Sequence, residues 1–94
     1  MGSDTDGTGS LRIDKWLWHA RFCKTRAIAQ ERASAGRIRL NGQRIEKPGV
    51  RVKPGDVMTL VVGREVVVVR ILGLGDRRGP AAEAQTLYEI LKDA

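Results

Sequence analysis

Cationic side chains are the residues of this sequence whose placement most directly implies a chemistry. Residues 11–53 hold twelve Lys and Arg against three Asp and Glu, a net charge of +9. Residues 54–94 have a net charge of −1, and residues 1–10 of −2. A surface that only keeps a protein soluble normally mixes both signs. The one-sided excess therefore predicts that the first half of the chain forms a patch for a polyanion.

Side chains that could catalyse a reaction or hold a metal are scarce. Cys23 is the single cysteine and His19 the single histidine, so we expect no internal disulfide and no Cys/His metal site. No nucleophile–base pair is apparent, and Gly73-Leu-Gly75 is not a P-loop. We therefore expect a non-enzymatic protein without a metal, a cofactor or a small-molecule substrate.

The first cations lie in a segment with helical periodicity, residues 11–22. Trp18 lies on a second apolar side of this helix. Packing of its indole against the last helix of the chain is favoured over stacking on a nucleic-acid base. Arg21 projects near Asp14, so an ion pair and a contact with the polyanion are both open. On a helical wheel the core-facing stripe comprises Ile13, Trp16, Leu17 and Ala20, and a basic face comprises Arg12, Lys15 and His19.

A second helix is predicted from Thr25, a good N-cap, to Ala35, with Gly36 as its left-handed stop. Arg26 and Gln30 are four residues apart and share a face. Free backbone N–H groups and the helix dipole favour an anion at the first turn, where the Arg26 guanidinium can join them. Thr25 and Arg26 are thus the predicted anchor for a phosphate.

The remaining segments predict short strands and one more helix. Asn41-Gly42 is a type I′ hairpin turn between two alternating segments, and Pro80 suits the first turn of a helix. The fold class is α+β: two N-terminal helices packed on a small antiparallel or mixed sheet, plus a C-terminal helix. The predicted strands are 37–40, 43–45, 57–62 and 65–72, the last helix is 81–92, and its inner face holds Ala84, Leu87, Tyr88 and Leu91.

The chain is expected to form a single domain over residues 11–94. Residues 1–10 hold no large apolar side chain after Met1, so we expect a disordered tail. The aspartates of this tail do not fit a signal peptide. The longest apolar run, Val66 to Val69, is too short to span a bilayer. These features predict a cytoplasmic location and no membrane partner.

Several motifs, in order and at the usual spacing, resemble the S4 RNA-binding domain, also called the αL motif. No single piece is decisive, but the combination is specific. The resemblance implies an αL core over about residues 11–60, with additional strands and a C-terminal helix over 61–94. The motifs are Leu11-Arg-Ile-Asp-Lys-Trp-Leu-Trp18, Lys24-Thr-Arg-Ala27, Gly36-Arg-Ile-Arg-Leu-Asn-Gly42, and Lys47-Pro48 to Pro54-Gly-Asp56.

Two branches of this family resemble the chain in particular. Trp16, Trp18 and the segment Ala-Glu-Ala-x-x-Leu-Tyr over 82–88 resemble the heat-shock protein fifteen branch. The ending Tyr-Glu-Ile-Leu-Lys over 88–92 is similar to the small S4 proteins of bacterial ribosome quality control. Both resemblances imply binding to ribosomal RNA of large subunits that are obstructed by a nascent chain on tRNA. The implied role is rescue or recycling of such subunits after stress.

The family pattern also implies where RNA is bound. Its RNA face follows the start of the second helix and the adjoining hairpin, and the first helix extends it. Few aromatic side chains are present, so recognition of RNA shape and phosphates is expected rather than base sequence. Arg44, Lys47 and Arg51 fit solvated loop charges equally well. The implied RNA-binding residues are Arg12, Lys15, Arg21, Lys24, Thr25, Arg26, Gln30, Arg37, Arg39, Asn41, Gly42, Gln43 and Lys47.

Two departures from the family pattern affect these expectations. Members place a bulky apolar pair late in the second helix, where this chain has Arg32-Ala33. Either the core is thinner there or Arg32 adds to the RNA face. The heat-shock branch carries a long basic C-terminal extension, whereas this sequence ends at Ala94, so we expect no ribosome contact through such an extension.

Two other functions fit part of the sequence. S4 domains also form arms of pseudouridine synthases and tyrosyl-tRNA synthetases, and Arg12-Ile13-Asp14 is similar to a triplet around a synthase's catalytic aspartate. The surrounding synthase residues are missing, so Asp14 is interpreted as a charged residue of the first helical turn. A protein–protein adaptor could instead use the sheet edge over 57–72 and the last helix, with Val66 to Val69 adding to a partner's sheet. Packing of that run under helices on both faces is the favoured alternative.

Overall fold

The computed structural model describes residues 9–93. Most of the predicted disordered tail, residues 1–8, lies outside the described residues. Ser10, which the prediction placed in the tail, contacts the folded chain. The Arg51 side chain donates to the Ser10 hydroxyl oxygen at 2.8 Å and to its carbonyl oxygen at 3.0 Å.

Helix α1 (Ile13–His19) is shorter at both ends than the predicted span of 11–22. Before it, strand β1 (Leu11–Arg12) pairs antiparallel with β4 (Arg51–Val52), a pairing that the helical periodicity did not indicate. After it, Arg21 adopts a φ of 65°, in the left-handed region where a right-handed helix ends. The predicted core stripe of this helix is buried.

Helix α2 (Arg26–Ser34) begins and ends close to the prediction. Thr25 is its N-cap, and the Thr25 hydroxyl oxygen accepts a backbone N–H of the first turn at 3.1 Å. Ala29 and Ala33 are fully buried. Their small side chains allow α2 to pack closely against α1, which brings polar residues of the two helices within hydrogen-bonding reach of one another.

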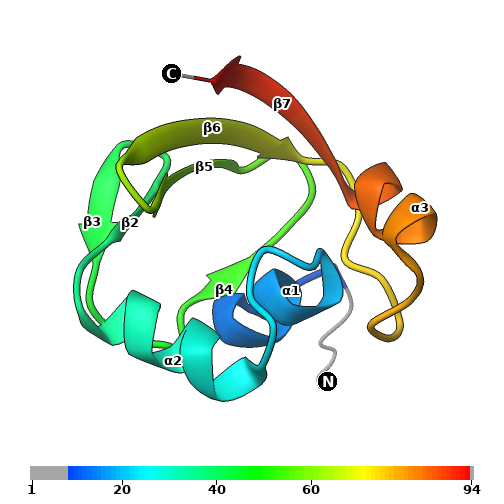
Figure 1. Ribbon diagram of the computed structural model, residues 1–94, viewed down its shortest axis with the longest axis horizontal. Helices are drawn as coiled ribbons and strands as arrows, with labels where there is room; N and C mark the ends of the chain where they lie inside the picture. Colours follow the sequence, from blue (N-terminus) through cyan, green and yellow to red (C-terminus); the bar gives the residue numbers. More distant parts are fainter. Residues whose placement is uncertain (1–8, 94) are drawn as a thin grey trace.

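Five antiparallel strands form the main sheet, which arches over α1 and α2 (Figure 1). Asn41 and Gly42 have φ values of 52° and 85°, as the predicted type I′ turn requires. The α+β class, the hairpin and the two long strands are therefore confirmed. In the order β3-β2-β5-β6-β7, the strands are β3 (Gln43–Ile45), β2 (Ile38–Leu40), β5 (Val57–Val62), β6 (Glu65–Ile71) and β7 (Tyr88–Asp93).

The C-terminal segment differs most from the prediction. The helix expected over 81–92 is wrong beyond its first turns: α3 spans Ala81–Ala84, a 3₁₀ turn η1 spans Gln85–Leu87, and β7 follows. Strand β7 pairs with β6, whose backbone groups would otherwise be unpaired along one edge. Of the predicted inner face, Ala84 and Leu87 are buried, Tyr88 is half-buried and Leu91 is exposed.

The valine run of β6 is neither an edge nor packed on both faces. Strand β6 lies between β5 and β7, so its backbone is already paired. Val69 is buried, whereas Val66 is 40% exposed, because the helices cover one face of the sheet only. The expectation that this run packs under helices on both sides is therefore wrong. The alternative that it adds a strand to a partner's sheet is also wrong, because β6 already has a neighbour on each side.

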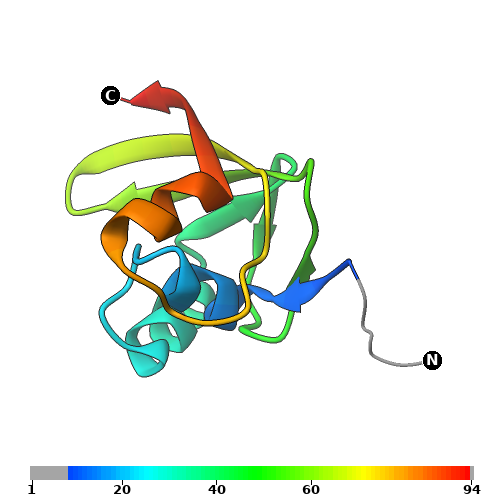
Figure 2. The same ribbon diagram turned by 90° about the vertical axis from the view of Figure 1, so that its right-hand side faces the viewer.

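The loop between β6 and α3 runs down beside α1 before the chain returns to the sheet (Figure 2). It is held there by α1, because the indole N–H of Trp16 donates to the Gly73 carbonyl at 2.8 Å. Trp16 is fully buried, as predicted. The core between sheet and helices also includes Ile13, Leu17, Ile38, Val52, Met58, Leu60, Val69 and Ile71.

A buried aspartate fixes the tip of the β2–β3 hairpin to the sheet. The amide Nδ2 of Asn41 donates to Asp56 Oδ1 at 3.2 Å, and Asn41 Oδ1 accepts the Val57 N–H at 2.9 Å. Lys53 donates to the same carboxylate through its backbone N–H and its Nζ, both at 3.0 Å. The hairpin is thereby held at one orientation relative to β5.

We predict that Asn41→Ala lowers the free energy of unfolding by about 1–3 kcal/mol, because it leaves buried Asp56 short of a donor and disfavours the positive φ. Urea unfolding followed by circular dichroism measures this. Asn41→Gly removes the same hydrogen bonds but tolerates the backbone angle, so it should lie between the alanine variant and the unchanged protein. An alanine variant of unchanged stability would contradict the assignment.

Candidate nucleic-acid interface

Asp14 is the centre of the candidate site. Its carboxylate is fully buried at the first turn of α1. Arg12 donates to it through Nε at 3.1 Å and Nη2 at 3.2 Å, and Gln30 through Nε2 at 3.1 Å. The backbone N–H of Lys15 adds a bond of 2.8 Å, and Arg26 Nε lies 3.5 Å from Oδ2. Asp14, Arg12, Arg26 and Gln30 are called the Asp14 cluster below.

The cluster keeps its carboxylate ionised. Burial alone would raise the pKa of Asp14, but the hydrogen bonds from Arg12 and Gln30 and the charge of Arg26 outweigh it, so the pKa lies below its ordinary value. The side chains of Arg12 and Arg26 remain 43% and 42% exposed. Each guanidinium is thus oriented by Asp14 and still presents donors to solvent, where a phosphate could reach them.

The hairpin contributes a second group of cations, Arg37, Arg39 and Arg44, called the hairpin arginines. Arg39 and Arg44 lie directly opposite each other on β2 and β3, and like charges in that position are unfavourable without an anion between them. Arg44 has a weak partner, since its Nε lies 3.6 Å from Glu46 Oε2. Among the described residues, Arg37 and Arg39 make no ion pair. They line a surface hollow of about 500 Å³ on the outer face of the sheet.

The position of Arg44 also explains why residue 36 is a glycine. Its guanidinium lies against Gly36, where a Cβ atom would collide with Arg44 Nε and Nη2. Gly36 has a φ of 74°, so it both ends α2 and allows the arginine to cross the junction. The predicted helix stop is therefore also a point of close approach.

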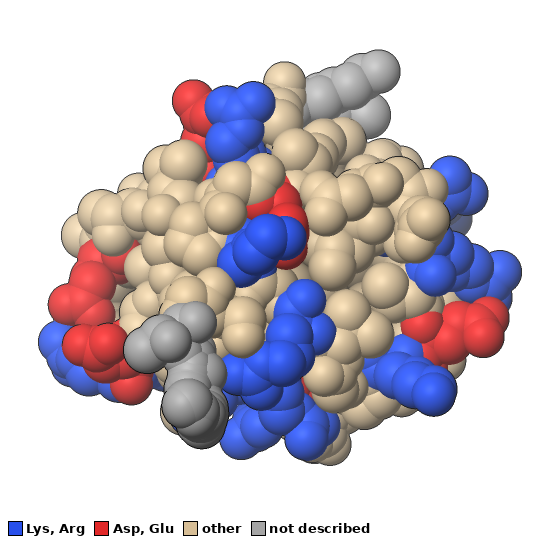
Figure 3. All heavy atoms as spheres, turned by 180° about the vertical axis from the view of Figure 1, so that it is seen from behind, with Lys and Arg blue, Asp and Glu red and all other residues tan. Residues whose placement is uncertain are grey.

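The distribution of charge over one face of the molecule is consistent with these two cationic groups (Figure 3). Lys and Arg atoms gather along the lower part of Figure 3, the side on which α1 and α2 lie, and at its right, on the side of the β2–β3 hairpin. Smaller groups of Lys and Arg atoms at the top, centre and left of that view lie beside Asp and Glu atoms, and acidic atoms are also interspersed at the right. The positive charge is thus concentrated over the helix pair and the hairpin.

Other predicted site residues are placed in different ways. Asn41 is occupied by the Asp56 contact described above, and Thr25 by its N-cap bond. Gly42 serves the turn geometry and has open space around it. Arg21 pairs neither with Asp14 nor with another carboxylate of the described chain, because its Nε donates to the Gly79 carbonyl at 2.6 Å. The exposed side chains that remain available at the site's edge are Lys24, Gln43 and Lys47, with Lys15 half-buried.

Two adjacent aromatic residues of α1, Trp18 and His19, lie away from the cationic groups. His19 is not on a basic face as predicted: it is 1% exposed, and its Nδ1 lies 3.1 Å from the Leu74 carbonyl oxygen. Trp18 is half-buried, with its ring centroid 5.7 Å from that of His19. His19 therefore faces the loop after β6, and Trp18 lies beside the His19 ring.

The role of Asp14 was not predicted from the sequence. A signal was present, because Asp14 is three residues before Leu17 and so lies beside the apolar stripe, where an unpartnered carboxylate would be costly. Its neighbour Arg12 and the shared face of Arg26 and Gln30 were identified separately. What could not be derived was that the two helices cross with these groups in contact.

Among the described residues no helix is long and apolar enough to cross a membrane. Nor does that part of the chain contain a group of three or more His, Cys, Asp or Glu side chains arranged to hold a metal ion.

Two helices followed by a tight hairpin, with cations on both, form the arrangement of an S4 domain, and the S4 domain family matches residues 11–58. Heat shock protein 15 of Escherichia coli (strain K12) is 44% identical over 79 residues, 84% of this chain and 59% of the relative. The heat shock protein 15 homolog of Aeromonas salmonicida is 40% identical over 89 residues, 95% of this chain and 67% of the relative. This chain thus spans about 60 to 67% of the length of these relatives.

A shorter relative is matched over nearly its whole length. The RQC P-site tRNA stabilizing factor of Bacillus subtilis (strain 168) is 40% identical over 83 residues, 88% of this chain and 94% of that protein. The trimeric structure of Vibrio cholerae Heat Shock Protein 15 superimposes with a TM-score of 0.81 at 42% identity, covering 86% of this chain and 81% of that one. The chain belongs to the S4 domain family, within the group that contains heat shock protein 15 and the RQC P-site tRNA stabilizing factors. None of these names denotes an enzyme.

The lowered pKa of Asp14 predicts how stability responds to acid. The unfolded-state pKa is about 3.9, so the ionised carboxylate contributes its full stability above that value and loses it as pH falls through the lower folded pKa. Asp14→Asn should therefore be less stable at neutral pH by about 1–3 kcal/mol. The difference from the unchanged protein should shrink below about pH 4.

Urea unfolding at a series of pH values measures this difference. The pKa of Asp56 is also lowered, but Asp56 is present in both proteins, so its contribution cancels in the stability difference. Asp76→Asn, at an exposed position, is the matched control and should leave the pH profile unchanged. A stability difference between Asp14→Asn and the unchanged protein that stays constant down to pH 2 would contradict the assignment.

Proposed function

We propose that this chain is a non-catalytic protein that binds structured RNA through the Asp14 cluster and the hairpin arginines. The observation that carries the proposal is the contact of Arg12, Arg26 and Gln30 with one buried carboxylate. Cations that are held in place lose less side-chain entropy when they bind phosphate than free ones do. The two arginines thus form a preorganised phosphate-binding surface.

The start of α2 strengthens this surface. Arg26 is the first residue of the helix, where backbone N–H groups point outward and the dipole favours an anion. A phosphate there would meet N–H donors and the Arg26 guanidinium together. Lys24, next to the N-cap, is exposed and extends the charge.

Gln30 provides a means to favour RNA over DNA. Its Nε2 donates to Asp14, which fixes the amide so that Oε1 is an acceptor beside the two guanidinium groups. A ribose 2′-hydroxyl is a donor that DNA lacks. Because aromatic side chains are few, phosphates and 2′-hydroxyls rather than stacked bases would provide most of the binding free energy.

The proposed target is ribosomal RNA of the large subunit, with tRNA as a further partner. Support comes from the relatives, since one group of them is named for stabilising a P-site tRNA. The chain would act in the cytoplasm, in the rescue or recycling of large subunits obstructed after stress. No catalytic step is part of this role.

We predict that affinity for purified large subunits falls steeply with salt, with the release of about four to eight counterions. Arg26→Ala should weaken binding by about 1–3 kcal/mol and lower the salt slope by about one ion. Co-sedimentation over a range of potassium chloride concentrations measures both quantities.

Arg70→Ala is the matched control for this experiment. Arg70 is an exposed arginine on β6 that pairs with Glu89 at 2.9 Å, and it belongs to neither cationic group. Its loss should leave affinity unchanged. A nearly flat salt response, or equal effects of the two alanine variants, would contradict the proposed surface. Equal affinity for small subunits would remove the large-subunit assignment.

A further inference from the structure

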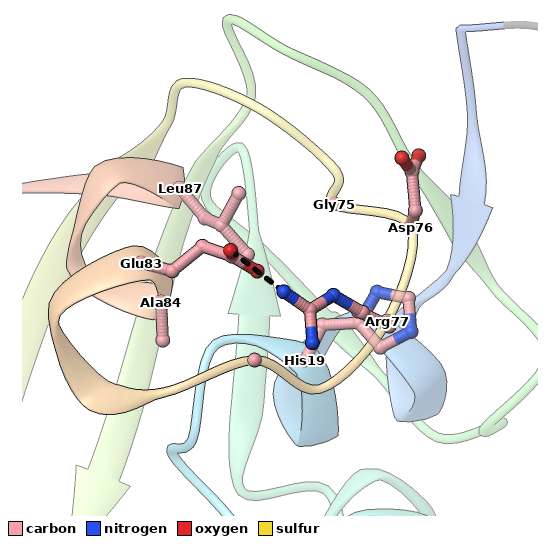
Figure 4. Close-up of a pocket in the computed structure, with 8 residues that line it drawn as sticks. His19, Gly75, Asp76, Arg77, Glu83, Ala84 and Leu87 are labelled. Carbon is pink, nitrogen blue, oxygen red and sulfur yellow. Dashed lines mark hydrogen bonds and ion pairs between the residues drawn. The ribbon is translucent and has the colours of Figure 1, made fainter.

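A cavity of about 370 Å³ lies where α1, the loop after β6 and α3 meet. It falls within the size range of small-molecule sites, roughly 300–1,000 Å³. Figure 4 shows Glu83 and Leu87 entering from the C-terminal segment, Arg77 from the loop and His19 from α1. The Asp14 cluster and the hairpin arginines take no part in it.

The cavity has a fixed wall. Besides the bond from Trp16 to Gly73, Arg21 Nε donates to the Gly79 carbonyl at 2.6 Å. The loop of residues 73–79 is therefore attached to α1 and its C-terminal turn at both of its ends. A surface loop held in this way can present a preformed site.

His19 leaves a buried acceptor at this wall. Its Nδ1 lies 3.1 Å from the Leu74 carbonyl oxygen, which only accepts, so Nδ1 carries the proton. In the neutral ring Nε2 is then an acceptor. This atom is buried and has no hydrogen-bond partner among the described residues. Because this atom has almost no accessible surface, His19 forms part of the cavity wall and does not offer a polar contact to a ligand.

An ion pair crosses the cavity. Arg77 Nη2 lies 3.1 Å from Glu83 Oε1, both side chains are about half exposed or more, and they point toward each other (Figure 4). Asp76, also in the lining, adds a second carboxylate. One cation and two anions do not suit a phosphate, and that part of the chain offers no metal-ligating group. The chemistry favours a neutral ligand with N–H donors beside an acceptor.

We propose that this cavity binds an unpaired guanine base. Guanine carries adjacent N–H donors at N1 and N2, which suit the Glu83 carboxylate, next to O6, which accepts from arginine. Arg77 and Glu83 present these two complementary groups side by side. Leu87 and Ala84 provide apolar contact for the ring.

The inference rests on the proposed function in one respect: the guanine belongs to the bound RNA, as a base displaced from a loop or bulge. Lys15 lies one helical turn before His19 on α1 and directly follows Asp14. An RNA strand on the Asp14 cluster would thus have a cation beside the cavity. The site would add base recognition to a surface that otherwise reads phosphates.

The test uses neutral ribonucleosides and the single histidine of the sequence. Guanosine, adenosine, cytidine and uridine are titrated into the full chain while the His19 ring resonances are followed by NMR. Guanosine should give a saturable shift and the other three should not. Glu83→Gln should weaken the guanosine response about tenfold or more, whereas Glu89→Gln, in another exposed ion pair, should leave it unchanged.

No response to guanosine, equal responses to all four nucleosides, or equal effects of the two glutamine variants would overturn the inference. Failure of the proposed function is distinguishable from this. Large-subunit binding that is lost in Arg26→Ala, without any guanosine response, would overturn the base site alone. A guanosine response in a chain that does not bind large subunits would support base recognition and overturn the proposed RNA function.

Discussion

Burial of the Asp14 carboxylate is the constraint on which the candidate interface depends. A charge removed from water is very costly unless it is paired and hydrogen-bonded. Asp14 meets that requirement with Arg12 of β1, and with Gln30 and the nearby guanidinium of Arg26, both of α2. The packing of α1 against α2 through small alanines therefore also determines where the cations lie. Stability and the proposed RNA binding are therefore linked through the same carboxylate.

Asp56 has the same role at the other end of the surface. It accepts hydrogen bonds from Asn41 and from Lys53, and the pKa of Asp56 is lowered because these bonds outweigh the effect of burial. The hairpin that carries Arg39 is thereby held relative to the sheet. Two buried aspartates thus position two groups of cations, so a folded RNA would meet a rigid surface rather than mobile side chains.

Local signals in the sequence predicted much of the fold. The Thr25 cap, the Gly36 stop and the Asn41-Gly42 turn act within a few residues, and all three are confirmed. The prediction of the last helix was wrong beyond its first turns. Residues 88–93 form a strand because they pair with the edge of β6, and that edge is distant in sequence. The Asp14 cluster was missed for the same reason: Arg12 and Gln30 were identified, but their common partner depends on how two helices cross.

A double-mutant cycle between Asp14→Asn and Arg26→Ala, read as affinity for structured ribosomal RNA at fixed salt, tests the central claim most directly. If Asp14 positions Arg26 for phosphate, removal of the arginine should cost less in the Asp14→Asn background than in the unchanged protein. The coupling should be at least about 0.5 kcal/mol, the size that separates contacting residues from independent ones. Equal losses in the two backgrounds would show that the cations act independently and would contradict the account.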